Sequence, residues 1–217
     1  MHFSPRSPVC RFVVLALAAG ACLSAGAARY TLVDLGQRFP AAMNDHEDVA
    51  ANNRTHAVIL RDGRWHRLSD HQSFATAING HGDVAGHNGA RPMLWQRGKP
   101  ERQLPLPDDG IFGVAAGIND RRTVIGLFEA NDATIHCFQW MPNEGSTDIG
   151  FMAGGNFCQP FGVNDAGQIT GEASTRPDPD RLPHAFVYDQ GVFHDGEIVG
   201  VGRAPDGHAH GFLLRPE

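Results

Sequence analysis

The sequence predicts an all-β repeat protein, built as a ring of about five small antiparallel sheets. Three observations lead to this prediction. A ten-residue pattern, written GVNDAGQITG at 162–171, occurs in four copies along the chain. A second pattern, written HAFVYDQG at 184–191, follows each copy with its apolar residues alternating as in half-buried strands. No stretch has helical periodicity of useful length.

The chain begins with a predicted signal peptide at residues 1–27. A basic start precedes an apolar run from Phe12 to about Ala21, which is too short to span a bilayer, and small residues ending at Ala27 fit the A-x-A cleavage pattern. Export to the periplasm or the extracellular space is therefore expected, with residues 28–217 as one mature domain. The alternative, a lipid anchor on Cys22, lacks the leucine-like residue three places earlier, where Ala19 stands.

The charge of the mature chain excludes one class of partner. Loss of Arg6 and Arg11 with the signal lowers the 18 Lys and Arg to 16, against 24 Asp and Glu, for a net charge of −8. Nucleic acid is therefore not an expected partner. No later apolar run approaches the length of a membrane span, and no cofactor-binding motif is present.

The first pattern predicts a hairpin turn. Its asparagine recurs at spacings of 35, 40 and 45 residues, as Asn44, Asn79, Asn119 and Asn164. An asparagine side chain bonds its own backbone two residues on, and glycine three places later supplies the positive φ that closes a bulged hairpin. The glycines at that place are Gly82, Gly167 and, in an incomplete fifth copy, Gly196. These residues are expected to be structural, and the copies with Glu47 or Arg122 there should carry backbone strain or use a looser turn.

The second pattern opens with a histidine in four of its five copies: His56, His136, His184 and His210. Equivalent positions in a ring lie one per sheet, far apart, so they are not expected to share a metal ion. We expect each to bond neighbouring backbone at the strand entrance. A pair at His208 and His210, or oxygens from RPDPDR at 176–181, are alternative metal sites without the regular ligand spacing.

A unit of 35 to 45 residues with four strands has the size of a propeller blade. The incomplete fifth unit lacks its first strand, and RYTLVDLG at 29–36 is expected to close the ring as a fourth strand, which would remove an exposed sheet edge. A β-sandwich of the same strands is the alternative.

These residues resemble a known family, the HAF repeat of bacterial extracellular proteins, named for His-Ala-Phe. The full match is His184-Ala185-Phe186, with near matches beginning at His56, His136 and His210, while Arg91-Pro92-Met93 departs most. The resemblance covers nearly all of the mature chain. It implies secretion and a repeated β structure, and it transfers no functional residue.

Two cysteines remain after removal of the signal, Cys137 and Cys158, both in apolar-flanked segments. In an oxidising compartment they are expected either to form a disulfide or to remain as two small buried thiols.

The expected recognition surface lies on one face of the repeat, where the connections between the second and third strands lengthen in the later copies. Its candidate binding residues are Arg176, Asp178, Asp180, Arg181, Arg203 and Asp206. Tolerated loop growth explains the same lengths equally well.

Three functional interpretations follow. The first is an exported binding module for an envelope, glycan or protein ligand, with no catalytic residue, metal or cofactor. The second is a secreted glycan hydrolase with its acids in the long loops, because the strands leading into the asparagine turns contain no acid. The third is a truncated gene product of weak stability.

Overall fold

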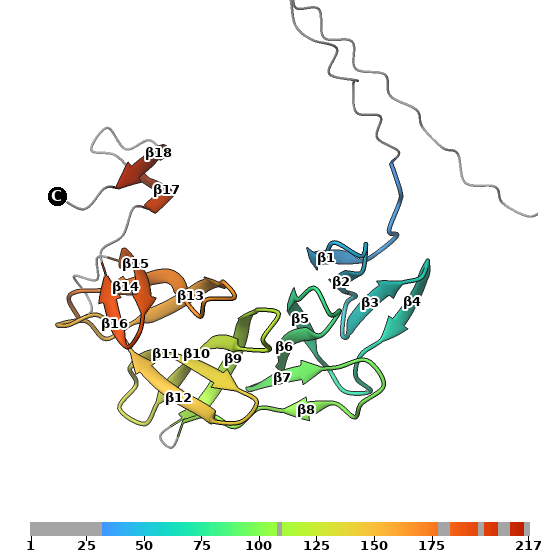
Figure 1. Ribbon diagram of the computed structural model, residues 1–217, viewed down its shortest axis with the longest axis horizontal. Coiled ribbons are helices and arrows are strands. Elements are labelled where there is room, and N and C mark those ends of the chain that lie inside the picture. Colours follow the sequence, from blue (N-terminus) through green and yellow to red (C-terminus); the bar gives the residue numbers. More distant parts are fainter. Residues whose placement is uncertain (1–31, 108–109, 178–182, 195–197, 204–208, 215–217) are drawn as a thin grey trace, which may run out of the picture. The chain divides into compact units, whose positions relative to one another are not determined.

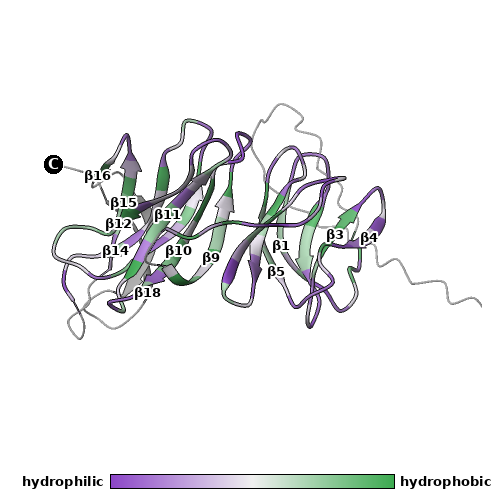
Figure 2. Ribbon diagram, turned by 90° about the horizontal axis from the view of Figure 1, so that it is seen from below, coloured by the Kyte–Doolittle hydropathy of each residue, from purple (hydrophilic) through white to green (hydrophobic). Residues whose placement is uncertain are grey.

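The computed structural model of the protein describes residues 32–107, 110–177, 183–194, 198–203 and 209–214, and these residues form strands and turns without a helix (Figure 1). Residues 1–37 and 38–217 are two separate units, and all strands lie in the second. In Figure 2 the hydrophobic colouring is concentrated on the strands, while most connecting loops are hydrophilic.

Four sheets each contain four consecutive antiparallel strands, in the order of the sequence. Sheet 1 contains β1 (Phe39–Met43), β2 (Val49–Asn52), β3 (Ala57–Arg61) and β4 (Arg64–Arg67). Sheet 2 contains β5 (Phe74–Ile78), β6 (Val84–Asn88), β7 (Arg91–Trp95) and β8 (Arg102–Gln103). Sheet 3 contains β9 (Gly110–Ile118), β10 (Val124–Ala130), β11 (Ile135–Met141) and β12 (Gly145–Gly150). Sheet 4 contains β13 (Cys158–Val163), β14 (Ile169–Ser174), β15 (Pro183–Asp189) and β16 (Val192–His194).

A fifth, two-stranded sheet pairs β17 (Ile198–Arg203) with β18 (Ala209–Leu214). Its register places Gly200 opposite Phe212, as the second and third strands of sheet 4 place Gly171 opposite Phe186. The fifth sheet therefore corresponds to the two middle strands of a unit.

The prediction of an all-β repeat is confirmed, and two finer expectations are corrected. The described strands form five separate sheets rather than two, so the sandwich alternative is wrong. The closing strand expected at 29–36 does not form over its described residues: 32–36 adopt no strand, and Leu32 and Val33 are 69% and 67% exposed. No sheet of the described chain closes on itself.

The asparagine turns share one geometry. In each, the asparagine backbone N–H bonds the carbonyl four residues on, and the N–H three residues on bonds the asparagine carbonyl. The residue at that third place has positive φ: 63° at Glu47, 75° at Gly82, 66° at Arg122 and 90° at Gly167. Glu47 and Arg122 thus adopt the left-handed conformation that glycine adopts more easily.

The same asparagines also join neighbouring sheets. The Nδ2 of Asn44 donates to the carbonyl of Asn79 at 3.1 Å, that of Asn79 to Asn119 at 3.0 Å, and that of Asn119 to Asn164 at 2.8 Å. Meanwhile each Oδ1 accepts the backbone N–H four residues on within its own turn. One amide therefore closes a turn and links that turn to the next sheet. We call this series of Nδ2 bonds the asparagine ladder.

The aspartate after the asparagine adds a second link between turns. Oδ1 of Asp120 accepts the N–H of Gly80 at 2.6 Å, and Oδ1 of Asp165 accepts the N–H of Asp120 at 2.9 Å. Each such bond runs from one sheet to the next. Hydrogen bonds between side chains and backbone groups thus connect each turn to the next. These bonds do not depend on the identity of neighbouring side chains.

Ion pairs reinforce the first two junctions. Asp48 pairs with Arg61 at 2.9 Å, and the same guanidinium donates to the carbonyl of Gly82 in the next sheet at 2.8 Å. Arg122 of sheet 3 reaches back to Asp83 of sheet 2 at 2.6 Å, and the Asp83 side chain is only 5% exposed. Arg122 therefore compensates a carboxylate that is largely removed from water.

Between the sheets, large side chains of one sheet pack on small or branched side chains of the sheet before it. Sheet 2 places Met93 and Trp95 against Ala50 and Ile59 of sheet 1. Further junctions follow this rule, with Phe128, Phe138 and Trp140 against Ala85 and Leu94, and with Phe186 and Ile169 against Ile125 and Cys137.

The glycine seven places after each asparagine is fixed by this packing. A Cβ on Gly86, Gly126 or Gly171 would lie 2.0, 2.1 or 2.3 Å from a carbonyl oxygen of the first strand, and within 3 Å of the ring of Trp95, Phe138 or Phe186 respectively. The first strands are irregular in register at this point. Sheet 1 has Ala51 at this place, opposite the smaller Val58.

A disulfide connects sheets 3 and 4. Cys137 on β11 and Cys158 on β13 are bonded, with their Cα atoms 5.2 Å apart, and both residues are fully buried. The bond closes a loop with a sequence separation of 21 residues, which by loop entropy stabilises the folded chain by about 3 kcal/mol over its reduced form.

We predict that Asn79→Asp lowers the free energy of unfolding by about 1–3 kcal/mol, because it keeps the turn acceptor but removes the ladder donor at a site that is 4% exposed. Asn143→Asp is the matched control, since Asn143 is exposed in the turn between β11 and β12 and belongs to none of the asparagine turns of the repeat. Urea denaturation of the mature protein measures both. Equal losses would contradict an energetic role for the ladder.

A second pair of variants separates backbone strain from ion pairing. Glu47→Gly should raise the free energy of unfolding by about 1 kcal/mol, because Glu47 is exposed and has positive φ. Arg122→Gly relieves the same strain but leaves Asp83 without its guanidinium, and should lower stability by about 1–3 kcal/mol. Opposite signs in denaturant melts are expected; the same sign in both would show that one of these contributions is absent.

Candidate ligand-binding pocket

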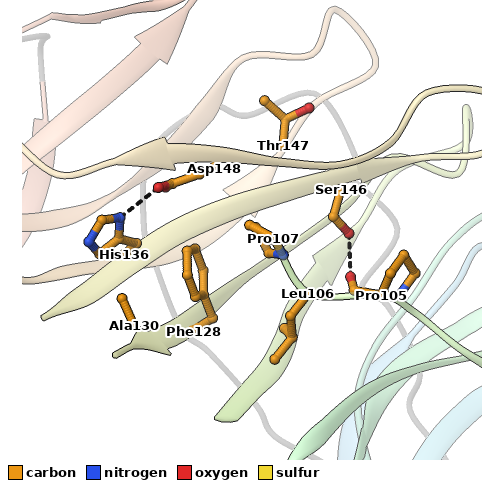
Figure 3. A pocket seen from close by; sticks show the side chains of 9 residues that line it. All are labelled: Pro105, Leu106, Pro107, Phe128, Ala130, His136, Ser146, Thr147 and Asp148. Carbon is orange, nitrogen blue, oxygen red and sulfur yellow. Dashed lines mark hydrogen bonds and ion pairs between the residues drawn. The ribbon is translucent and has the colours of Figure 1, made fainter. Parts of the chain in front are cut away.

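A pocket of about 540 Å³ lies beside sheet 3 (Figure 3). Strands β10, β11 and β12 provide one wall, and the segment between β8 and β9 provides the other. The lining residues are Pro105, Leu106, Pro107, Phe128, Ala130, His136, Ser146, Thr147 and Asp148. Residues of two repeat units therefore form it.

The lengthened connection of the third unit helps to build this pocket. The segment predicted as a loop at 127–135 is mostly strand, because β10 continues to Ala130 and β11 begins at Ile135. A tight turn joins them, with Ala133 at a φ of 65°. The extra residues thus extend a hairpin and bring Ala130 and His136 to the pocket.

The outer segment is held in place by one bond from β12. The hydroxyl of Ser146 donates to the carbonyl of Pro105 (Figure 3). Leu106 packs on the buried cluster that contains Phe128 and Phe138. Two prolines with restricted φ further limit the motion of this wall.

His136 is the centre of the polar side of the pocket. Its Nδ1 lies 2.8 Å from Oδ2 of Asp148, and its Nε2 lies 2.7 Å from the hydroxyl of Thr134 (Figure 3 shows the first contact). Its ring contacts Phe128 and Phe151, with centroids 5.1 and 4.9 Å apart. Both nitrogens of the imidazole therefore have partners, and two aromatic rings contact it.

The polar chain continues to a fourth residue. Thr134 donates its hydroxyl to Oδ1 of Asp132 at 2.5 Å and its backbone N–H to the same oxygen at 3.0 Å. These bonds, with a smaller contribution from His136, lower the pKa of Asp132 below its ordinary value. At the other end, Oδ1 of Asp148 accepts the N–H of Gly150 at 2.7 Å.

Both nitrogens of His136 and both oxygens of Asp148 have protein partners, so the protein itself fixes the positions of these two side chains. The pocket offers an apolar wall of Leu106 and Phe128 beside a fixed polar wall, which is the usual composition of a small-ligand site.

A second cavity of about 330 Å³ lies among the turns of sheets 1 and 2. Its cations are mostly engaged. Arg61 pairs with Asp48, and Arg97 lies 3.9 Å from Asp62.

Two of the six binding residues predicted in the long loops lie in the described chain. Arg176 is exposed beyond the end of β14, and Arg203 ends β17. Asp178, Asp180, Arg181 and Asp206 lie outside the described residues, as do Gly196 and His208. Arg176 does not line the pocket.

The repeated histidines also depart from expectation. His56 bonds Thr55 and Arg67, and His136 bonds Thr134 and Asp148, so their partners are side chains rather than the expected backbone. His184 is exposed at the start of β15, and His210 lies in β18. Within the described ranges no three His, Cys, Asp or Glu residues are arranged to hold a metal ion.

Sequence reasoning missed Ser146, Asp148 and the segment 105–107. A signal was present in STDIGFM, since Ser146 and Asp148 alternate on one face of a predicted strand. Their partners, however, lie in other strands or in another repeat unit, and spacing along the chain does not reveal them.

No protein-family model, curated protein or solved structure matches the chain. In the described part of the chain, no helix is long and apolar enough to cross a membrane.

One titratable group lies outside both cavities. His87 on β6 is half-buried, stacks on Phe74 with centroids 5.3 Å apart, and its buried Nδ1 has no hydrogen-bond partner. Burial lowers the pKa of His87 below its ordinary value, against a smaller opposing effect of a hydrogen bond with the backbone of Gly89.

This lowered pKa predicts a loss of stability in acid. The unfolded chain binds the proton more readily than the folded chain, so stability is full above the ordinary histidine pKa of about 6.5 and falls as the pH drops below it. The difference in unfolding free energy between pH 8 and pH 5 should be smaller in His87→Gln than in the wild type. His71→Gln, at an exposed position, is the control and should leave the difference unchanged. Identical pH dependence in wild type and His87→Gln would refute this assignment.

Proposed function

We propose that the protein is an exported binding module of the HAF-repeat kind, with the pocket beside sheet 3 as its ligand seat. The four-stranded sheets are, on this proposal, successive blades of a propeller-like arrangement. The ligand is an envelope component, a glycan or a protein segment small enough to enter about 540 Å³.

The observation that carries the proposal is the fixed, two-sided lining of the pocket. His136 and Asp148 are locked by mutual and neighbouring hydrogen bonds, so a ligand would meet a wall that is already ordered. Pre-ordered side chains lose little conformational entropy on binding. The apolar Leu106 and Phe128 side accommodates a sugar face or an apolar side chain.

Export is supported by the predicted signal peptide and agrees with the disulfide. A buried bond between Cys137 and Cys158 persists where thiols are oxidised. The small-residue cleavage pattern ending at Ala27 leads to the same compartment.

The test is a binding screen with a blocked pocket. Purified mature protein is applied to arrays of glycans, envelope fractions and secreted proteins, and any captured ligand is measured again with Pro107→Tyr, which places a larger ring in the segment between β8 and β9 that lines the pocket (Figure 3). Binding should weaken roughly tenfold or more. Arg64→Tyr, exposed on β4 outside both cavities, is the control and should bind as the wild type does.

Two results would contradict the proposal. One is the absence of any binder across all three arrays. The other is a ligand whose affinity is the same in wild type, Pro107→Tyr and Arg64→Tyr, which would place binding elsewhere on the molecule.

A further inference from the structure

The junction between consecutive sheets has the same parts at each of its three occurrences. The earlier sheet gives an asparagine Nδ2, and the later sheet gives the carbonyl of its own asparagine. The residue before the later asparagine joins the apolar cluster between the sheets, as Ile78 and Ile118 do. The junction is therefore a directional contact, with one side that gives and one that receives.

Sheet 1 has a receiving side without a giver among the described residues. Met43 holds the place of Ile118 in its unit, yet Met43 is 67% exposed while Ile118 is 8% exposed. Phe39, on the same strand, is 69% exposed. The carbonyl of Asn44 accepts the N–H of Glu47 in its own turn, and no unit precedes it in the described chain to give an Nδ2.

Sheet 4 has a giving side whose asparagine bonds no other sheet in the described chain. Asn164 directs its Nδ2 to Oε1 of Gln168 in its own turn, at 2.7 Å, instead of to another sheet. Thr170 is exposed, whereas the equivalent Ala50, Ala85 and Ile125 are fully buried by the sheet that follows each of them. Phe161 is 58% exposed at the place of Thr76, whose hydroxyl bonds the carbonyl of Ala115 in the next sheet.

The fifth sheet lacks the parts of this junction. In the alignment of units, Phe193 stands where the fifth asparagine would be. Phe193 instead belongs to β16, pairs with Tyr188, and packs its ring on Phe186 and Tyr188. The strand that precedes the turn in other units is therefore used as the fourth strand of sheet 4. Strands β17 and β18 can neither receive from Asn164 nor give to Asn44 through an asparagine turn.

We propose that sheet 4 of one copy of the chain docks on sheet 1 of a second copy. In this contact the Nδ2 of Asn164 donates to the carbonyl of Asn44 of the second copy, and Phe161 covers Met43 and Phe39. The contact continues the three junctions already present in each chain. Two such contacts related by a two-fold axis close a ring of two copies, with no free giving or receiving side.

The charges on these sides permit the contact. Met43, Phe39, Phe161 and Thr170 are all uncharged, so docking removes apolar surface from water without burying an unpaired charge. An aspartate at Met43 or at Phe161 would place such a charge in the contact.

The experiment measures the molar mass of the mature protein by light scattering over a range of concentrations. The wild type should have twice the mass of one chain. Met43→Asp and Phe161→Asp should each weaken association roughly tenfold or more and shift the mass toward one chain. Val192→Asp replaces a 52% exposed apolar residue on β16, outside the contact, and should retain the wild-type mass. Circular dichroism melts verify that all variants fold.

Mixing the variants tests the direction of the contact. A Met43→Asp copy keeps its giving side, and a Phe161→Asp copy keeps its receiving side, so an equimolar mixture should form pairs that neither variant forms alone. A wild type that stays at the mass of one chain overturns the proposal, as does a mixture without pairs. Neither result bears on the pocket beside sheet 3, because Pro107 and Arg64 lie outside the contact.

Discussion

The hydrogen bond from each asparagine Nδ2 to the next turn is the interaction on which the arrangement of sheets depends. One planar amide provides an acceptor that closes its own turn and a donor that reaches the following sheet. Aspartate could supply the acceptor and lysine could supply a donor, but neither side chain could supply both. Turn geometry and sheet spacing are therefore set by the same atoms.

The glycine and aromatic residues of the repeat follow from this spacing. A first strand irregular in register brings its carbonyl close to the second strand, and an aromatic ring from the third strand fills the space above the same residue. Gly126 and Phe138 are thus a coupled pair, and so are Gly171 and Phe186. Sheet 1 has Ala51 and Val58 instead, so a larger residue at the glycine position faces a smaller one at the aromatic position. The sequence pattern accordingly reflects packing within each sheet and against the sheet before it.

Local chemistry made the turns and strands predictable from the sequence. The contacts between units could not be predicted from it. The asparagine turn and its positive-φ residue depend on five consecutive residues, so both could be predicted from the local sequence. The second bond of each asparagine spans 35 to 45 residues and carries no local signature. The pocket is similar, because Pro105 and Asp148 belong to different units. The expected closing strand at 29–36 was predicted from its likeness to the last strand of a unit, but such a likeness does not specify a partner strand, and residues 32–36 adopt no strand.

The third unit departs from the repeat in three respects. There Arg122 replaces the turn glycine, β10 and β11 are longer than their counterparts in the first two units, and Cys137 replaces the alanine of the second pattern. Cys137 directly follows His136, so the disulfide to Cys158 ties the backbone of the pocket wall to sheet 4. Ile135 is held on the other side by the carbonyl of Asn156. A wall fixed at both neighbours of His136 keeps that imidazole and Asp148 in one geometry before any ligand arrives. On the proposal that this pocket binds a ligand, such rigidity reduces the entropy lost on association.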